Sequence, residues 1–121
     1  MLQVYVALSN PRLVPGHLLI IPKRHVERLS LLTTLERKGL FETAIEFQEK
    51  ILNKISSGCD LTQHCRPFQP QNNLKINHIH IHLRPREFKD ELYQKSQIFE
   101  TDMFKELPED EAATFSKLLK E

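Results

Sequence analysis

The chain has 121 residues, a hydrophobic content of 40% and a formal net charge of +1 at pH 7. This length suits one small domain with a single core, and the near-neutral charge argues against bulk nucleic-acid binding through the phosphate backbone but leaves room for a local basic site. Because no apolar run is long enough to span a membrane and the first residues do not resemble a signal peptide, we expect a soluble cytoplasmic protein.

The first part of the chain predicts two short strands. Residues 2–8 are rich in Val and other apolar residues, as is typical of a strand. Residues 10–12 contain a proline and begin a loop. After a Pro-Gly turn, residues 17–21 form a second apolar strand, which we expect to end at Pro22. A basic loop over residues 23–25 follows.

A long central helix is predicted next. Thr33 and Glu36 have the spacing of a capping box, in which each side chain bonds to the other residue's main-chain N–H. Apolar residues then recur at helical spacing, which favours a helix that packs one side on a sheet. Gly58 is a plausible residue to end this helix. The recurring apolar residues are Leu40, Phe41, Ala44, Ile45, Ile51, Leu52 and Ile55.

The segment from 60 to 70 is polar, with a short strand expected around residues 66–68 and a turn directly after it. Cys59 and Cys65 lie on either side of His64, but their spacing matches no common zinc motif and a fourth ligand is missing. Two free thiols are therefore the favoured interpretation.

The most informative segment is the predicted strand over residues 74–84. It carries His78, His80 and His82 at a spacing of two. Alternate residues of a strand point to the same side, about 7 Å apart, while the intervening Ile and Leu residues point to the other side. A purely structural histidine row is disfavoured, because burial of three unpartnered imidazoles is costly. Histidine titrates near neutral pH, so the row favours proton or phosphoryl chemistry.

Two helical segments are expected at the end of the chain. Residues 89–106 are charged and carry a narrow apolar stripe, and a last helix begins near Pro108 with acidic residues in its first turn. We therefore expect one domain over 1–121, with a core of about 4–88 and a helical extension of about 89–121.

Two blocks carry a resemblance to a known family. The block 10–29 contains Pro-Gly-His followed by an apolar strand and a basic loop, and the block 78–86 contains His-x-His-x-His followed by Arg-Pro-Arg. In this order, with a helix between them, they resemble the histidine triad (HIT) superfamily over about residues 4–88. The resemblance implies an α+β fold: an antiparallel sheet of about four or five strands, a long central helix and added C-terminal helices. Family members are commonly homodimers.

The resemblance also implies an activity. The chain would be a nucleotide hydrolase or transferase in which His80 attacks the α-phosphorus of a dinucleoside polyphosphate or a nucleoside phosphoramidate. A nucleotidyl-histidine intermediate would form and then react with water, which splits one difficult displacement into two easier ones. The main-chain carbonyl of His78 would hold the other ring nitrogen of His80. No metal or other cofactor is implied.

The neighbouring histidines receive roles in the same way. His82 would contact the phosphoryl oxygens or the leaving group, where a protonated imidazole could stabilise charge and deliver a proton. His78 would position its neighbours, and His17 would support the triad from the adjacent strand.

The expected ligand is a purine nucleotide or a dinucleoside polyphosphate. Asn10 would meet the ribose, while Asn72 and Asn73 are candidates for phosphate contacts. Arg84 is a further candidate, because arginine binds phosphate through two parallel hydrogen bonds. For Arg86 we expect instead an ion pair with Glu87 or Asp90.

Two alternatives remain open from the sequence. Three histidines on one side of a strand can ligate zinc or copper, so the chain could be a metal-binding protein. It could also bind nucleotide without catalysing a reaction.

Overall fold

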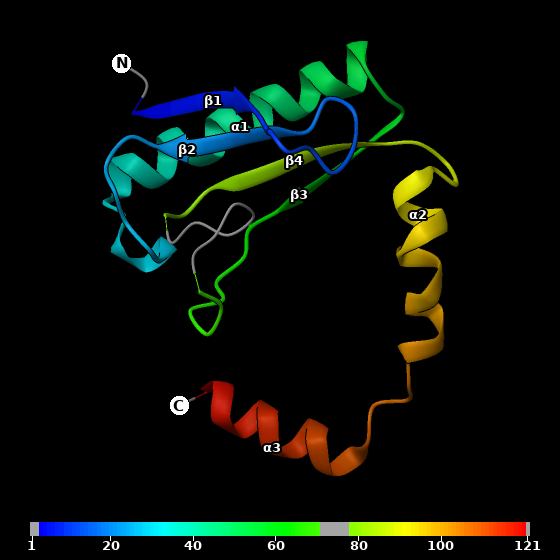
Figure 1. The fold of residues 1–121 in the computed structure, drawn as a ribbon. Coiled ribbons are helices and arrows are strands. Elements are labelled where there is room, and N and C mark those ends of the chain that lie inside the picture. Colours follow the sequence, from blue (N-terminus) through cyan, green and yellow to red (C-terminus); the bar gives the residue numbers. More distant parts are fainter. Residues whose placement is uncertain (1–2, 71–77, 121) are drawn as a thin grey trace.

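The protein is described by a computed structural model that covers residues 3–70 and 78–120 (Figure 1). An antiparallel sheet of four strands in the order β1-β2-β4-β3 forms its centre, which confirms the expected α+β fold. The strands are β1 (Val4–Leu8), β2 (Leu18–Pro22), β3 (Gly58–Thr62) and β4 (Ile81–Arg86).

Strand β4 lies between β2 and β3 and alternates strictly between the two sides of the sheet. Ile81 and Leu83 are fully buried, whereas His82 and Arg84 are partly exposed on the opposite side. His82 pairs with Leu19 of β2 and with Thr62 of β3. The predicted separation of histidines from isoleucines is therefore correct, because a strand has a period of two.

Helix α1 (Thr34–Lys54) covers the apolar side of the sheet (Figure 1). The predicted capping box is confirmed, since the Glu36 N–H donates to Thr33 Oγ1 and the Thr33 N–H donates to the Glu36 carboxylate. The apolar core combines α1 with the inner strands, and its fully buried residues include Leu40, Ala44 and Ile51 of α1 together with Ile20, Ile81 and Leu83 of the sheet.

Two boundary predictions in this region are wrong. The helix ends at Lys54 rather than near Gly58, and Gly58 instead begins β3. A Cβ at Gly58 would lie 3.4 Å from the main-chain oxygen of Arg86, an ordinary contact, so pairing of β3 with β4 does not require a glycine there. The strand expected around residues 66–68 is absent, because pairing with β4 places the strand at 58–62 despite its polar composition.

The histidine strand is also shifted. Strand β4 begins at Ile81 and continues to Arg86, two residues beyond the predicted end, because Pro85 pairs with Cys59 of β3. His78 and His80 precede the strand. Residues 74–77 of the predicted strand lie outside the described residues.

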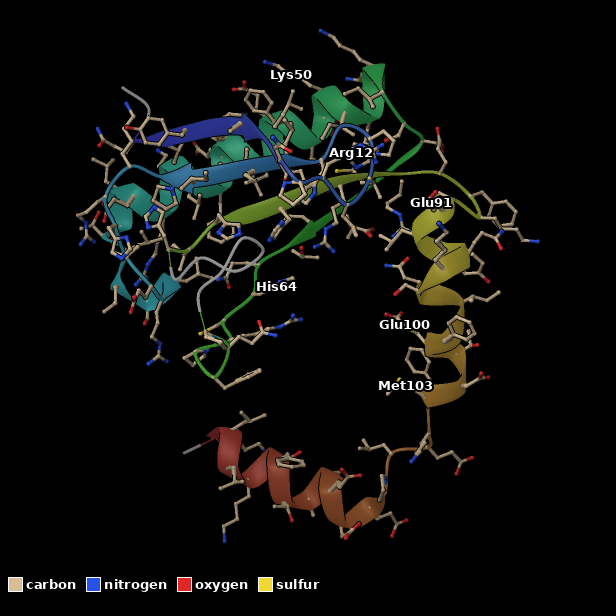
Figure 2. All side chains as sticks on the ribbon, in the orientation of Figure 1. Arg12, Lys50, His64, Glu91, Glu100 and Met103 are labelled. Carbon is tan, nitrogen blue, oxygen red and sulfur yellow. The ribbon has the colours of Figure 1, made fainter. Side chains whose placement is uncertain are left out.

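The C-terminal extension forms an arm of three short elements. The arm consists of α2 (Glu91–Lys95), the 3-10 helix η2 (Gln97–Met103) and α3 (Glu109–Lys120). A further 3-10 helix, η1 (Leu29–Leu31), lies before α1 and is not part of the arm. The continuous helix predicted over 89–106 is therefore broken at Ser96. None of these three elements contains a buried residue, and Figure 2 shows Glu91, Glu100 and Met103 spaced along α2 and η2. In the part of the chain described here, no helix is both long and apolar enough to cross a lipid bilayer.

Candidate active site

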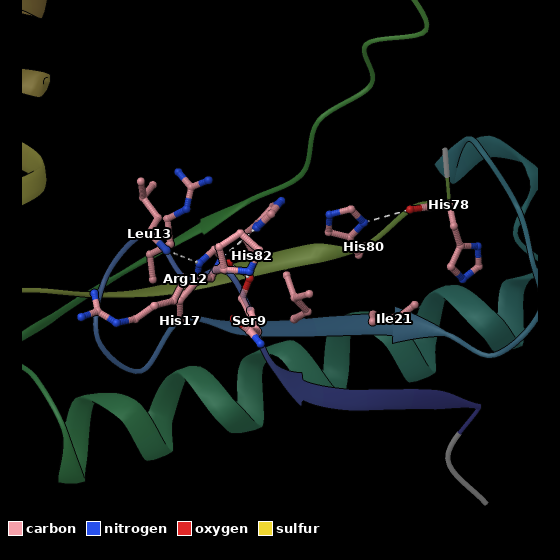
Figure 3. A pocket seen from close by; sticks show the side chains of 12 residues that line it. Ser9, Arg12, Leu13, His17, Ile21, His78, His80 and His82 are labelled. Carbon is pink, nitrogen blue, oxygen red and sulfur yellow. Dashed lines mark hydrogen bonds between the residues drawn. The ribbon is translucent and has the colours of Figure 1, made fainter. Parts of the chain in front are cut away.

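A cavity of about 320 Å³ opens on the side of the sheet opposite α1 (Figure 3). The four predicted catalytic histidines, His17, His78, His80 and His82, all line it. Of the predicted nucleotide-binding residues, Asn10 and Arg84 also line the cavity, whereas Asn72 and Asn73 lie outside the described residues.

His80 occupies the middle of the row of histidines (Figure 3). Its Nδ1 donates a hydrogen bond to the main-chain oxygen of His78 at 2.9 Å. Since a carbonyl oxygen only accepts, the ring proton must be on Nδ1, and Nε2 carries the lone pair. Nε2 makes no hydrogen bond to any residue in 3–70 or 78–120. This is the tautomer that a nucleophilic histidine requires.

The His82 ring is oriented by a chain of two hydrogen bonds. The main-chain N–H of Leu13 donates to His17 Nδ1 at 3.1 Å, so in neutral His17 the proton is on Nε2. His17 Nε2 then donates to His82 Nδ1 at 2.9 Å. Neutral His82 therefore carries its own proton on Nε2, the nitrogen that is left for a ligand. His80 offers a lone pair and His82 offers an N–H.

A turn at Gly16 positions His17 for its hydrogen bond to His82. Gly16 has a φ of +80°, a conformation that side-chain-bearing residues rarely adopt, and a Cβ there would lie 3.0 Å from the Pro85 ring. The turn thus places His17 directly before β2, beside His82 of β4. His17 itself is buried.

Both rings of this pair are neutral at physiological pH. Burial, with smaller contributions from His80 and Arg84, lowers the pKa of His82 to about 3. Burial also lowers the pKa of His17 to about 4. In the ligand-free protein His82 is therefore a neutral N–H donor, and the protonated imidazole expected during the reaction stays a prediction.

His78 is held by main-chain groups, and its ring lies apart from those of His80 and His82 (Figure 3). Its Nε2 donates to the Pro22 carbonyl at 2.8 Å, and its Nδ1 accepts from the Val26 N–H at 3.3 Å. The exposed ring of His25 stacks on it at 4.8 Å between ring centroids. Since both nitrogens of His78 are engaged, the three histidines cannot share one metal ion. Among the described residues, no group of three His, Cys, Asp or Glu side chains could hold a metal ion.

A fifth histidine, His64, reaches the site and was not predicted there. It lies on the loop that follows β3 (Figure 2), with its ring 5.2 Å from that of His82 between centroids. Burial and the nearby charges of Arg66 and Arg84 lower its pKa. The sequence contained the information needed to place His64, because it lies two residues beyond Thr62, the partner of His82. That information required the correct position of β3, which the sequence analysis did not have.

Arg86 holds the first helix of the arm against the sheet. Its guanidinium bonds to Asp90 at 2.7 and 2.9 Å and to Asp60 at 2.7 Å. The expected ion pair with Asp90 is thus confirmed, whereas Glu87 accepts hydrogen bonds from Ser57 instead. Both cysteines are free thiols, as predicted.

Comparison with known proteins gives a consistent picture. The HIT domain family matches residues 3–89. The bifunctional bis(5'-adenosyl)-triphosphatase/adenylylsulfatase FHIT of Arabidopsis thaliana is 31% identical over 96 residues, which are 74% of this chain and 51% of that protein. The asymmetrical bis(5'-nucleosyl)-tetraphosphatase of Schizosaccharomyces pombe is 32% identical over 81 residues, which are 64% of this chain and 42% of that protein. The chain thus spans about half the length, or less, of these curated relatives.

A solved structure shares the fold. The crystal structure of a HIT family protein from Bacillus anthracis superposes with a TM-score of 0.69 at 20% identity. The match covers 98% of this chain and 80% of that one, so it extends over nearly all of the C-terminal arm as well as the sheet.

Proposed function

Because the chain belongs to the HIT domain family, we propose that it is a nucleotide hydrolase or transferase with His80 as its nucleophile. The substrate is a nucleoside phosphate derivative, either a dinucleoside polyphosphate or a nucleoside phosphoramidate. The names of the Arabidopsis and fission yeast relatives support this substrate class. The observation that carries the proposal is the His80 ring, with its proton bonded to the His78 oxygen and its lone pair on the other nitrogen.

The reaction follows from the proton positions. His80 Nε2 forms a bond to the α-phosphorus while the bond from phosphorus to the leaving oxygen or nitrogen breaks. The leaving group departs with the electron pair, and an anionic phosphate leaves without a proton. An amine needs one, which the His17–His82 pair first takes up from solvent and then passes on through His82 Nε2–H, because a neutral imidazole is too weak an acid to donate its only proton. Water then attacks the phosphorus, the N–P bond breaks and the nucleoside monophosphate leaves. The proton lost by water passes to solvent through His82.

The positive charge that develops on the His80 ring has a neighbour that stabilises it. In the nucleotidyl-histidine, the ring keeps its Nδ1 proton, and the His78 carbonyl accepts it at close range. His17 keeps His82 in the tautomer that faces the ligand with an N–H. His17 and His78 are therefore positioning residues in this mechanism.

Binding of the nucleotide combines both walls of the cavity. Leu19 and Ile21 of β2 provide an apolar surface on which a purine base can lie. Asn10 is assigned to the ribose and Arg84 to phosphate, and phosphate contacts from Asn72 and Asn73 stay predictions. The cytoplasmic location also stays a prediction.

We place the interface of the predicted homodimer on the outer side of α1. Phe41, Ile45 and Leu52 are exposed and share one stripe of the helix, next to the stripe that packs on the sheet. Such a patch favours a second copy of the chain as its partner. Light scattering after gel filtration should give a dimer, and Ile45→Asp should give a monomer; a monomeric wild type would contradict this part of the proposal.

The decisive experiment is to capture the intermediate. Wild-type protein is mixed with diadenosine tetraphosphate or with adenosine 5'-phosphoramidate, quenched under alkaline denaturing conditions and digested for mass spectrometry. We expect one adenylyl group on the peptide that contains His80, and none in His80→Asn. An adduct on another histidine would reject the assigned nucleophile. Binding of AMP without adduct or product would make the chain a nucleotide-binding protein instead.

A further inference from the structure

One side of the cavity carries positive charge whose effect on the choice of substrate the proposed mechanism does not specify. Arg84 lies two residues beyond His82 on the same side of β4 and lines the cavity. His64 and Arg66 approach from the loop after β3. The opposite wall, formed by Leu19 and Ile21 of β2, is apolar.

Among the described residues, none forms an ion pair with Arg84. Asp60 is its direct neighbour on β3, but the Asp60 carboxylate bonds to Arg86 at 2.7 Å. Within residues 3–70 and 78–120, no carboxylate lies within ion-pair distance of Arg84. Its Nε is shielded from solvent and has no hydrogen-bond acceptor there. A partly buried guanidinium without an acceptor is costly for the free protein, and an anion would relieve that cost.

The surroundings strengthen this demand for an anion. Burial together with the charges of Arg86 and Arg66 lowers the pKa of Arg84, although the attraction of Asp60 opposes this. The same two residues, Arg66 and Arg84, lower the pKa of His64. Thr62, which pairs with His82 across the strands, has a buried hydroxyl without a hydrogen-bond partner in the described part of the chain. Several donors thus face one region beside His82.

We propose that Arg84, with His64 and Arg66 beside it, forms a subsite for the phosphates of the leaving group and makes the enzyme prefer nucleoside polyphosphates to phosphoramidates. This inference rests on the proposed function. Neighbours on one side of a strand are about 7 Å apart, so Arg84 lies one side chain beyond His82, within reach of phosphates that extend from the reacting phosphorus. Arginine suits this task because its planar fork binds two phosphate oxygens at once.

The two substrate classes make different demands on the site. A polyphosphate leaving group departs as an anion, and Arg84 neutralises the charge that it gains. An amine leaving group is uncharged and needs the proton of His82 instead. Loss of Arg84 should therefore slow the first reaction much more than the second.

The test compares kcat/KM for diadenosine tetraphosphate and for adenosine 5'-phosphoramidate in wild type, Arg84→Met and Arg84→Lys. A charged hydrogen bond contributes about 1.5–3 kcal/mol, so Arg84→Met should lose about 10- to 150-fold on the polyphosphate. The ratio of the two kcat/KM values should fall at least tenfold, and Arg84→Lys should recover part of it. Arg37→Leu is the matched control, because Arg37 is exposed on α1 beyond the other side of the sheet.

A binding measurement separates the subsite from the chemistry. Calorimetric titration with inorganic tripolyphosphate should show binding that weakens at least tenfold in Arg84→Met and is unchanged in Arg37→Leu. If Arg84→Met does not fold, as judged by thermal unfolding, exposed Arg66→Met should give a smaller loss in the same direction.

The outcomes distinguish the two proposals. Turnover of both substrates with equal losses in Arg84→Met, and an unchanged affinity for tripolyphosphate, would overturn the subsite and leave the proposed function intact. Arg84-dependent binding of tripolyphosphate by a protein that turns over neither substrate would overturn the proposed function and support the subsite.

Discussion

The two sides of the sheet in this protein have different roles, one in the apolar core and one in the cavity, although strand β4 contributes side chains to both. Toward α1, strand β4 presents Ile81 and Leu83, which are completely buried. Toward the cavity it presents His82 and Arg84, which are partly exposed. Because alternation of side chains on a strand is strict, changes on one side can leave the other intact. Stability and chemistry should therefore respond to different substitutions.

The two sides also achieve order by different means. The apolar side is ordered by close packing. On the cavity side, hydrogen bonds of defined direction orient the rings: His17 to His82, and His80 to the His78 carbonyl. Packing fixes shape, whereas these bonds also fix which nitrogen carries a proton. That distinction is what gives His80 and His82 opposite roles.

The largest effect is expected on the cavity side. His80→Asn keeps a polar side chain of similar size but removes the nucleophilic nitrogen, so turnover of diadenosine tetraphosphate should fall more than about a thousandfold. The urea midpoint of unfolding should stay close to that of wild type. A large loss of stability would show that the two sides are not separable at this position.

On the α1 side, Leu83→Ala should lower the free energy of unfolding by about 2–5 kcal/mol, because it leaves a cavity in a fully packed core. Urea denaturation followed by circular dichroism measures this change. Leu119→Ala is the matched control, since Leu119 is 85% exposed on α3 and should cost almost nothing. Equal costs for the two variants would contradict the position of the core.

Acidification should weaken the protein through the cavity side. The unfolded chain binds a proton at each histidine near pH 6.5, whereas folded His17 and His82 do so only at about pH 4 and pH 3. The unfolded state therefore takes up more protons as the pH falls through 6.5, and stability decreases. The urea midpoint should be lower at pH 5.5 than at pH 7. The double variant His17→Asn/His82→Asn should show a smaller difference; an unchanged difference would assign it to other groups.

The smallest effect is expected at the start of α1. Thr33→Ala removes the side-chain half of the capping box and should cost about 1 kcal/mol of stability. Thr33→Ser keeps the hydroxyl and should restore most of it. Turnover by the folded protein should be unchanged, because Thr33 does not line the cavity. A loss of turnover would show that the helix cap and the histidines are coupled.

The features that the sequence predicted correctly depend on residues close together in the chain. The capping box joins positions three apart, and the Arg86–Asp90 ion pair joins positions four apart. The alternation of histidine with isoleucine predicted the two sides of β4. Such features need only local geometry, which has the same period in every strand or helix.

The boundaries that were wrong depend on distant partners. Strand β3 is polar and has little strand character, yet pairing with β4 places it at 58–62 and brings His64 to the cavity. Composition alone does not encode these choices, since tertiary pairing can override weak local preference.

By itself, then, the sequence determined that three histidines share one side of an extended segment, and it pointed to His80 as the central one. Only the tertiary structure decided which atoms of these rings face a ligand. His17 and His82 are 65 positions apart, and their hydrogen bond forms because β2 and β4 pair in one register. The position of a proton on an imidazole is set by the partner on its other nitrogen, and that partner comes from elsewhere in the fold.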